Sequence, residues 1–335
     1  MKAFRIASWG DGGKLVEVEK PIPQAGEVRL KVAANGICHS DLYLLKEWKK
    51  SPPHLQISLP MTLGHEGAGY VDAVGAGVEG FELGEAMLIT ISGCGKCYYC
   101  SIGQNQYCMD KTKQVGMGLD GANAEYVVAP ASALVSAKGL DLAQAAPLSD
   151  AGLTSYHAIN RVRKLLVPTS RVAVIGVGGL GHMALQILKA TTNAHIIAYI
   201  RGSKSKDFAL SLGADEVRDS TDSNSFEPLS VDVVLDFVGS SITIEQSCGI
   251  IKPLGHIVVV GRGSGKFGFW HHAMPYGATI STTFGGTKSE LIELLGLARE
   301  GKVEAHIVKF PLEEVEKAYA LLEQGKIQGR GVIVP

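Results

Sequence analysis

Four cysteines lie within fifteen residues of this sequence, in the spacing C-x2-C-x2-C-x7-C. Gly95 and Gly103 within this stretch and Gly93 directly before it favour tight turns, which can bring the four thiolates together without help from the rest of the chain. Zinc in a structural site binds four such ligands in a tetrahedron, and a site with four protein ligands is closed to substrate. The sequence therefore predicts a structural zinc site formed by Cys94, Cys97, Cys100 and Cys108.

A second group of possible metal ligands is scattered over a longer part of the chain. It consists of Cys38 in the motif GICHSD, His65 and Glu66 in the motif GHEG, and Asp150 in the motif PLSDAGLT. One thiolate, one imidazole and one carboxylate would leave the fourth position of a tetrahedral zinc ion open. Lewis-acid catalysis needs such a position, so this group is a candidate catalytic metal site.

A glycine motif of the form G-x-G-x-x-G spans residues 176–181. It follows an apolar run that predicts a buried strand, and a predicted helix comes next. Glycines in this context let the backbone approach a pyrophosphate, which the N-terminus of the helix then stabilises. We therefore expect a dinucleotide at Gly176, Gly178, Gly179, Leu180 and Gly181; the alternative is a tight glycine turn without a ligand.

The residues that follow the predicted strand at 194–200 indicate which dinucleotide is bound. An enzyme that uses NAD usually carries an acidic residue about 20 positions beyond the glycine motif. Here that position is Ile200, and the next carboxylate is Asp207, inside the following predicted helix. Arg201, Ser203 and Lys204 could instead hold a 2′-phosphate, which favours NADP(H) over NAD(H). The alternative is that these three are solvated surface residues.

The elements that must position these groups change in character at about residue 168. Before it, short apolar runs broken by glycine and proline predict strands at 28–32, 67–74, 85–91 and 121–128, and a largely helical stretch at 143–161. Beyond it, strands alternate with helices, which indicates a doubly wound parallel sheet with strands at 171–175, 194–200, 231–237, 255–260 and 278–283. Helices at 180–190, 204–212, 288–300 and 312–324 and a strand at 331–335 complete this α/β chain.

Composition narrows the class of protein. The 335 residues are enough for two domains, and the net charge of −1 gives no reason to expect nucleic acid or an anionic membrane as a partner. Residues 1–9 resemble a strand rather than a signal peptide, and we find no apolar run that is long enough to span a membrane. Five of the six cysteines lie in metal-ligand contexts, so we expect a reducing cytoplasm without disulfides, with Cys248 as a small core residue in a helix.

Together these motifs resemble the zinc-containing medium-chain alcohol dehydrogenase family, and in particular bacterial secondary-alcohol dehydrogenases with an aspartate zinc ligand. The resemblance covers essentially the whole chain, with the motifs in the order of the family. It implies a GroES-like β-rich catalytic domain (1–152 and 288–335, with a zinc lobe at about 92–110) and a Rossmann doubly wound parallel sheet (153–287). It also implies an active site in the cleft between the domains, and a homotetramer in which dimers pair the edges of their Rossmann sheets.

The resemblance assigns roles around the metal. Cys38, His65 and Asp150 would bind a catalytic zinc ion, although many members of the family have cysteine at the last position. A carboxylate also ligates zinc well; the alternative is a helix-capping acid in a crippled site. Glu66 would lie behind the metal and orient or transiently replace a ligand. The alternative for Glu66 is a buried acid that a nearby arginine neutralises.

The resemblance also assigns residues to cofactor and substrate. His39 and Arg330 would bind the pyrophosphate, Thr154 would lie under the nicotinamide ring, and Val238 would lie along the cofactor between Phe237 and Gly239. Ser40 would bond the substrate oxygen and start a proton relay, which in many members ends on a histidine where this chain has Tyr43. Ordinary polar, helical or strand-end residues are the alternatives. The expected substrate pocket comprises Ser40, Tyr43, Trp48, His54, Met117, Leu119, Phe284 and Gly285.

These expectations combine into one function. The chain would transfer hydride reversibly between a primary or secondary alcohol and NAD(P), with two zinc ions per chain, and glycine at position 285 would widen the pocket for bulky ketones or aryl-alkyl alcohols. The alternatives are a polyol or threonine dehydrogenase of the same fold, a zinc-free reductase of carbon–carbon double bonds, and a catalytically silent NADPH-binding protein. A silent protein with only the cysteine lobe would hold one zinc ion.

Overall fold

The computed structural model describes residues 1–52, 57–110, 114–202 and 205–335, and it divides into two compact units. The first unit comprises Met1–Leu153, Gly286–Arg299 and Ala305–Pro335, and the second comprises Thr154–Gly285 and Glu300–Glu304. Residues 300–304 thus group with the second unit, whereas the predicted domain division places them in the first. None of the helices in the described residues is long and apolar enough to cross a membrane.

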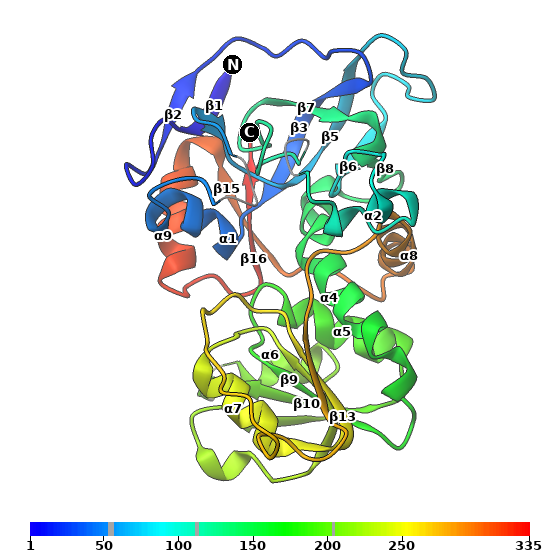
Figure 1. Cartoon of the computed structure of the whole chain (residues 1–335). Helices are drawn as coiled ribbons and strands as arrows, with labels where there is room; N and C mark the ends of the chain where they lie inside the picture. The colour runs from blue at the N-terminus through cyan, green and yellow to red at the C-terminus, as the bar shows by residue number, and fades with distance from the viewer. Residues whose placement is uncertain (53–56, 111–113, 203–204) are drawn as a thin grey trace. The chain divides into compact units, whose positions relative to one another are not determined.

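The first unit is built on a seven-stranded sheet (Figure 1). Its strand order is β15-β16-β3-β5-β6-β8, and β7 also pairs with β3. The bounds are β3 (Glu27–Gly36), β5 (Glu66–Val74), β6 (Ala86–Ile89), β7 (Tyr126–Pro130), β8 (Leu134–Ser136), β15 (Ile307–Pro311) and β16 (Arg330–Val334). A smaller antiparallel sheet of order β2-β1-β4 joins β1 (Lys2–Ile6), β2 (Gly13–Glu17) and β4 (Met61–Thr62).

Strand β3 is the element that brings the chain's beginning and end together. Its first half pairs with β7, its end pairs with β16, and its other edge pairs with β5. Gly36 at the end of β3 lies opposite both Glu66 of β5 and Val332 of β16. Residues that flank these three strand ends must therefore lie close together.

Short helical segments connect the strands of the first unit. They are α1 (His39–Leu42), the π-helix η1 (Tyr43–Glu47), α2 (Tyr98–Ser101), η2 (Asn105–Tyr107), η3 (Ala131–Ala133), α3 (Leu142–Ala145), η4 (Ala146–Ser149), α8 (Lys288–Arg299), η7 (Leu312–Glu314) and α9 (Val315–Glu323). Helix α9 packs its buried face, which includes Val315, Tyr319 and Leu322, into an apolar core shared with Phe4 and Ile37. This core fixes the helix against the segment that carries the GICHSD motif.

The second unit has a six-stranded, fully parallel sheet of order β11-β10-β9-β12-β13-β14. The strands are β9 (Arg171–Ile175), β10 (His195–Ile200), β11 (Glu216–Asp219), β12 (Val231–Asp236), β13 (Ile251–Val259) and β14 (Thr279–Thr282). Helix α4 (Ala151–Arg161) begins in the first unit and continues into the second from Thr154. The other helical segments of the second unit are η5 (Arg163–Leu165), α5 (Gly181–Thr191), α6 (Lys206–Ser211), η6 (Ser223–Ser225) and α7 (Ser241–Ile250). The central strands β9, β10 and β12 are almost fully buried, as expected where helices cover both faces of a parallel sheet, and the predicted doubly wound sheet is confirmed.

The structure corrects one predicted strand. The run at 121–128 was expected to be extended throughout, but β7 begins only at Tyr126. Residues Gly121, Ala122 and Asn123 instead donate backbone hydrogen bonds to the carbonyl groups of Thr62, Gly64 and Leu63. A side chain on Gly121 would lie 2.4 Å from the carbonyl oxygen of Gly64, so close backbone packing rather than sheet pairing explains the glycine.

Cys248 lies in α7 and is buried in the core of the second unit, as predicted. The strands β2, β4, β8, β11 and β15 were not predicted. The burial patterns of β2, β11 and β15 contain few fully buried positions, so the apolar signal on which sequence analysis depends is weak there, whereas β4 and β8 are buried but only two and three residues long.

A buried carboxylate at the end of β12 generates a stability prediction. Asp236 has no exposed surface and accepts hydrogen bonds from the backbone N–H of Val238 (2.9 Å), that of Gly239 (3.0 Å) and the hydroxyl of Thr243 (2.9 Å). Asp236→Ala would remove the acceptor of three donors, and we expect it to lower the free energy of unfolding by about 1–3 kcal/mol or more. Thermal unfolding followed by circular dichroism measures the change.

The matched control is Asp222→Ala, which removes a carboxylate that accepts one backbone hydrogen bond from Asn224 at an exposed turn. This variant should lose about 1 kcal/mol at most. An equal fall in Tm for the two variants would contradict the claim that burial makes Asp236 important.

Candidate functional site

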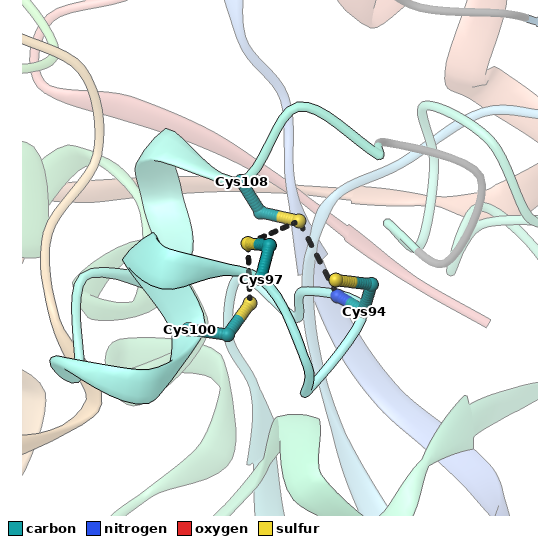
Figure 2. A group of neighbouring side chains, drawn as sticks. All are labelled: Cys94, Cys97, Cys100 and Cys108. Atoms are coloured by element: carbon teal, nitrogen blue, oxygen red, sulfur yellow. Dashed lines mark hydrogen bonds between the residues drawn. The ribbon is translucent and has the colours of Figure 1, made fainter.

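The cysteine lobe brings its four sulfur atoms together in the first unit (Figure 2). All four lie within 4.8 Å of one another; Cys97 Sγ is 3.6 Å from Cys100 Sγ and 3.7 Å from Cys108 Sγ. A disulfide would require about 2.05 Å, whereas ligands of tetrahedral zinc at about 2.3 Å lie about 3.8 Å apart. The spacing fits a tetrahedral metal site, and all six cysteines of the chain are free thiols.

The backbone around the lobe is folded tightly to allow this convergence. Helix α2 begins directly after Cys97, and the backbone N–H of Cys94 donates to the sulfur of Cys108 (3.3 Å). A side chain on Gly93 would lie 2.5 Å from the sulfur of Cys100, so that position needs glycine. Burial raises the pKa of Cys100 to about 12, whereas the backbone N–H groups of Lys96 and Cys97 lower the pKa of Cys94 to about 7.

The second predicted ligand group also converges, and it lies entirely in the first unit. One ligand atom each of Cys38, His65, Glu66 and Asp150 lies within 4.8 Å of the others. Cys38 follows the end of β3 by two residues, Glu66 begins β5, and Asp150 stands between η4 and α4. The antiparallel pairing of β3 with β5 thus places the thiol beside the imidazole, because Cys38 follows the end of β3 and His65 precedes the start of β5.

A buried aspartate orients the imidazole. His65 Nδ1 lies 3.1 Å from Asp41 Oδ1, and His65 Nε2 lies 3.7 Å from Asp150 Oδ2 and 3.3 Å from the hydroxyl oxygen of Ser40. A carboxylate beside Nδ1 favours the tautomer with its proton there, which leaves the lone pair of Nε2 for a metal ion. Sequence analysis did not single out Asp41, although it lies in the GICHSD motif.

Glu66 is paired with Arg330. Both are buried, with 0% and 2% of their surfaces exposed, and the guanidinium donates through Nε to Glu66 Oε2 (3.1 Å) and through Nη2 to Glu66 Oε1. Arg330 Nη2 also donates to Asp150 Oδ2 (3.2 Å). This is the arrangement expected of a buried acid neutralised by an arginine, and the predicted contact of Arg330 with a pyrophosphate stays a prediction. Because Glu66 is occupied, Cys38, His65 and Asp150 are the three donors left for a metal ion.

The pKa shifts reflect this concentration of charge. Burial raises the pKa of Glu66 well above its usual value, even though Arg330 opposes the shift. Burial also disfavours ionised Asp150, but His65 and Arg330 outweigh it and hold the pKa of Asp150 well below its usual range. Burial would lower the pKa of His65, but Asp41 and Asp150 raise it well above normal. A divalent cation would take the place of the proton between these groups, so the donor set fits zinc.

The glycine motif forms a candidate nucleotide site within the second unit. A side chain on Gly181 would lie 2.0 Å from the carbonyl oxygen of Gly176, so the first turn of α5 packs directly on the end of β9. A side chain on Gly178 would meet no atom within 4 Å. Packing therefore does not explain glycine at 178, whereas a pyrophosphate close to the backbone would. Leu180 occupies the N-cap position of α5, and Val238 packs against Gly176.

An acid that sequence analysis missed stands at the edge of this site. Arg201 follows β10, and the next backbone N–H, that of Gly202, lies 3.4 Å from Asp219 Oδ1 at the end of β11. Ile200 and Asp219 are register partners, so the missing acid of β10 has a neighbour one strand away. The signal would have been a carboxylate closing the next strand. Ser203 and Lys204 lie outside the described residues.

The predicted substrate residues divide between the two units. Ser40, Tyr43 and Trp48 belong to the first, where the two rings stack with centroids 6.2 Å apart and Trp48 packs against the apolar core. Phe284 and Gly285 belong to the second. Of the predicted cofactor residues, Thr154 also belongs to the second unit, and His39 and Arg330 belong to the first. A pocket shared by these residues stays a prediction, and His54 lies outside the described residues.

Comparison with known proteins gives concordant matches. Residues 24–139 match the model of the alcohol dehydrogenase GroES-like domain, and residues 212–333 match that of the zinc-binding dehydrogenase. An NAD-dependent alcohol dehydrogenase of Sulfolobus acidocaldarius is 34% identical, with 99% of each chain covered.

Solved structures agree. The alcohol dehydrogenase of Aeropyrum pernix has a TM-score of 0.92 at 32% identity, with all of both chains covered. The acetophenone reductase of Geotrichum candidum, solved in complex with NAD, has a TM-score of 0.91 at 30% identity and covers 100% of this chain and 97% of its own. Since these matches span nearly the whole chain, the protein belongs to the zinc-containing medium-chain alcohol dehydrogenase family.

Proposed function

We propose that this enzyme interconverts a primary or secondary alcohol and its aldehyde or ketone by reversible hydride transfer to NAD(P), with a catalytic zinc ion held by Cys38, His65 and Asp150. The convergence of one thiolate, one imidazole and one carboxylate within 4.8 Å in a buried setting carries the proposal. When bound there, zinc would act as a Lewis acid on the substrate oxygen and lower the pKa of the alcohol.

The residues around this group have separate tasks. Asp41 holds the imidazole of His65 through Nδ1, so that Nε2 faces Asp150. The hydroxyl of Ser40, 3.3 Å from Nε2, lies where it can accept the proton of a substrate alcohol and return it in the reverse reaction. A bound NAD(P) would supply the hydride acceptor. Since this chain has Tyr43 where many relatives end the relay on a histidine, the proton that Ser40 accepts would leave through the cofactor ribose and water or through another group of the protein.

The four cysteines of the lobe would hold a second, structural zinc ion. Four thiolates leave no open position, so this ion contributes to folding rather than to chemistry. Two zinc ions per chain distinguish this proposal from a silent protein that keeps only the lobe.

Arg201 supports the proposal that NADP(H) is preferred over NAD(H). The guanidinium follows β10, where NAD enzymes usually carry an acid, and together with Ser203 and Lys204 it would bind the 2′-phosphate. Asp219 acts in the opposite direction, because its carboxylate one strand away would repel that phosphate.

Further features support a substrate class and an assembly. Glycine at position 285 would widen the substrate pocket, and the structural relative named acetophenone reductase supports aryl-alkyl ketones as substrates. Strand β14 forms one end of the described parallel sheet, and the exposed rings of Phe269 and Trp270 precede it in the chain. Pairing of this edge with a second copy would give a dimer and, from two dimers, a cytoplasmic homotetramer.

Removal of a catalytic ligand tests the metal site. Cys38→Ala should abolish oxidation of 2-propanol and 1-phenylethanol and reduce the zinc content from two ions per chain to one, because two remaining donors cannot hold the ion. Cys248→Ala is the matched control, since both cysteines are 9% exposed but Cys248 packs in the core of the second unit. Metal analysis and initial rates measure both variants. A folded Cys38→Ala enzyme with full activity would contradict the proposed catalytic zinc site.

Loss of a lobe cysteine should act on stability instead. Cys97→Ala should release one zinc ion and lower Tm, while the fraction that remains folded keeps its turnover. Because the thiol of Cys100 has a pKa of about 12, zinc must displace its proton, and the lobe should lose zinc to a chelator more readily at about pH 6 than at about pH 8. Equal retention at both pH values would argue against thiolate ligation.

Substitution of the arginine tests the cofactor proposal. Arg201→Ala should raise KM for NADP roughly 10- to 100-fold, because the variant loses a hydrogen bond to the charged 2′-phosphate. KM for NAD should stay nearly unchanged, because NAD has no 2′-phosphate. Asp219→Asn is the matched change of opposite sign and should lower KM for NADP. If Arg201→Ala changes KM for both cofactors equally, or if the parent enzyme prefers NAD, the proposed 2′-phosphate site is contradicted. The proposed enzyme class would not be affected by either result.

A further inference from the structure

The carboxylate of Asp41 has contacts besides the one with the imidazole of His65. It has no exposed surface; one oxygen lies 3.1 Å from His65 Nδ1, and the other accepts the backbone N–H of Cys38 (3.0 Å) and the hydroxyl of Tyr319 (3.0 Å). A single carboxylate therefore contacts two of the three proposed ligand residues. The direction of its two oxygens decides where the imidazole points.

Tyr319 reaches Asp41 from a distant part of the chain. It lies in α9, 278 residues beyond Asp41, and only 4% of its surface is exposed. Its ring stacks on Phe4 with centroids 5.8 Å apart, and its hydroxyl oxygen accepts a hydrogen bond from Asn123 Nδ2 (2.8 Å). The hydroxyl is thus fixed both by packing and by a donor behind it.

Two buried amides extend the chain of hydrogen bonds back to the metal site. Asn123 Oδ1 accepts from Asn35 Nδ2 (2.8 Å), and Asn35 Oδ1 accepts from the backbone N–H of Glu66 (3.1 Å). Since Glu66 follows His65, the chain of bonds returns to the residue next to the imidazole from which it started. Each amide uses both its oxygen and its nitrogen, so only one orientation of each satisfies the network.

All donors in this ring point toward Asp41. The backbone of Glu66 donates to Asn35, Asn35 to Asn123, Asn123 to Tyr319, and Tyr319 to the carboxylate. Hydrogen bonds aligned head to tail polarise one another, and in a buried setting the effect on the last acceptor is strongest. Phenylalanine would fill the same apolar space, so packing alone does not account for the hydroxyl of Tyr319.

We propose that Tyr319 is a positioning residue of the catalytic metal site: through Asp41 it fixes the imidazole of His65 so that Nε2 faces the space between Cys38 and Asp150. The inference rests on the proposed function, because it concerns the same zinc site. Residues that hold a histidine ligand from behind typically contribute 10- to 100-fold to metal affinity. Removal of the hydroxyl would leave that oxygen of Asp41 with the N–H of Cys38 alone.

The test is the zinc affinity of Tyr319→Phe. Purified protein is equilibrated with zinc buffers over a range of free zinc concentrations, and the metal bound per chain is measured after rapid desalting. We expect the variant to pass from two zinc ions to one at a free zinc concentration roughly 10- to 100-fold higher than the parent enzyme does, with the lobe ion retained. With cobalt in the catalytic site, the absorption bands should shift because the imidazole is less rigidly held.

Tyr199→Phe is the matched control. Tyr199 is also fully buried, and its hydroxyl donates to the carbonyl oxygen of Ser225 (3.3 Å) in the second unit. It should lower Tm without changing zinc affinity or the cobalt spectrum. If Tyr319→Phe lowers Tm in the same way and binds zinc as tightly as the parent, Tyr319 only stabilises the fold and the proposal is overturned.

A second variant keeps the test decisive if Tyr319→Phe does not fold. Asn123→Leu retains Tyr319 and Asp41 but removes the donor behind the hydroxyl. Zinc affinity several-fold weaker than that of the parent supports the ring, and affinity within twofold overturns it. A parent enzyme that binds only one zinc ion per chain would instead contradict the proposed function itself, so the two failures are distinguishable.

Discussion

The buried ion pair between Glu66 and Arg330 is the constraint on which the candidate site depends. Two charges that are almost completely removed from water are costly unless they neutralise each other with good geometry, and here the guanidinium meets both carboxylate oxygens. Arg330 begins the last strand and Glu66 begins β5, so the pair joins the end of the chain to its β-rich beginning through β3. A side chain on Gly36 would lie 1.9 Å from the Glu66 carboxylate, which makes glycine at that register position part of the same constraint.

The two ligand groups illustrate different ways to bring donors together. The cysteine lobe draws all four sulfurs from one short segment, and glycine turns suffice to close it. The second group draws its donors from the ends of separate elements, so its geometry depends on sheet register and on residues that contact no metal, such as Asp41. A segment-local site survives changes elsewhere in the fold, whereas a register-dependent site needs a rigid support around it.

This difference also explains how much the sequence could predict. The doubly wound sheet was predictable because its strands are continuous apolar runs such as Arg171–Ile175, and the cysteine spacing indicated proximity by itself. The ring through Asn35, Asn123 and Tyr319 was not, because its members are separated by 88 and 196 residues and follow no periodic pattern. Asp219 was missed for a related reason: β11 is only half-buried, so the strand that places the acid near Arg201 carries no strong apolar signal.

The same ion pair explains how a carboxylate can serve at position 150. Arg330 donates to Asp150 Oδ2 as well as to Glu66. One guanidinium therefore links Asp150, a proposed metal ligand, to Glu66, which lies behind the ligands. A carboxylate has two oxygens and can accept from the arginine while it ligates a metal; a thiolate would have to share one sulfur atom between both tasks. With Glu66 balanced by Arg330, the negative charges of Cys38 and Asp150 together equal the charge of one zinc ion. These two ligands would therefore balance the charge of the ion, while the buried carboxylate of Asp41 behind His65 adds one further negative charge. A buried zinc ion held in this way with one open position would polarise an alcohol oxygen.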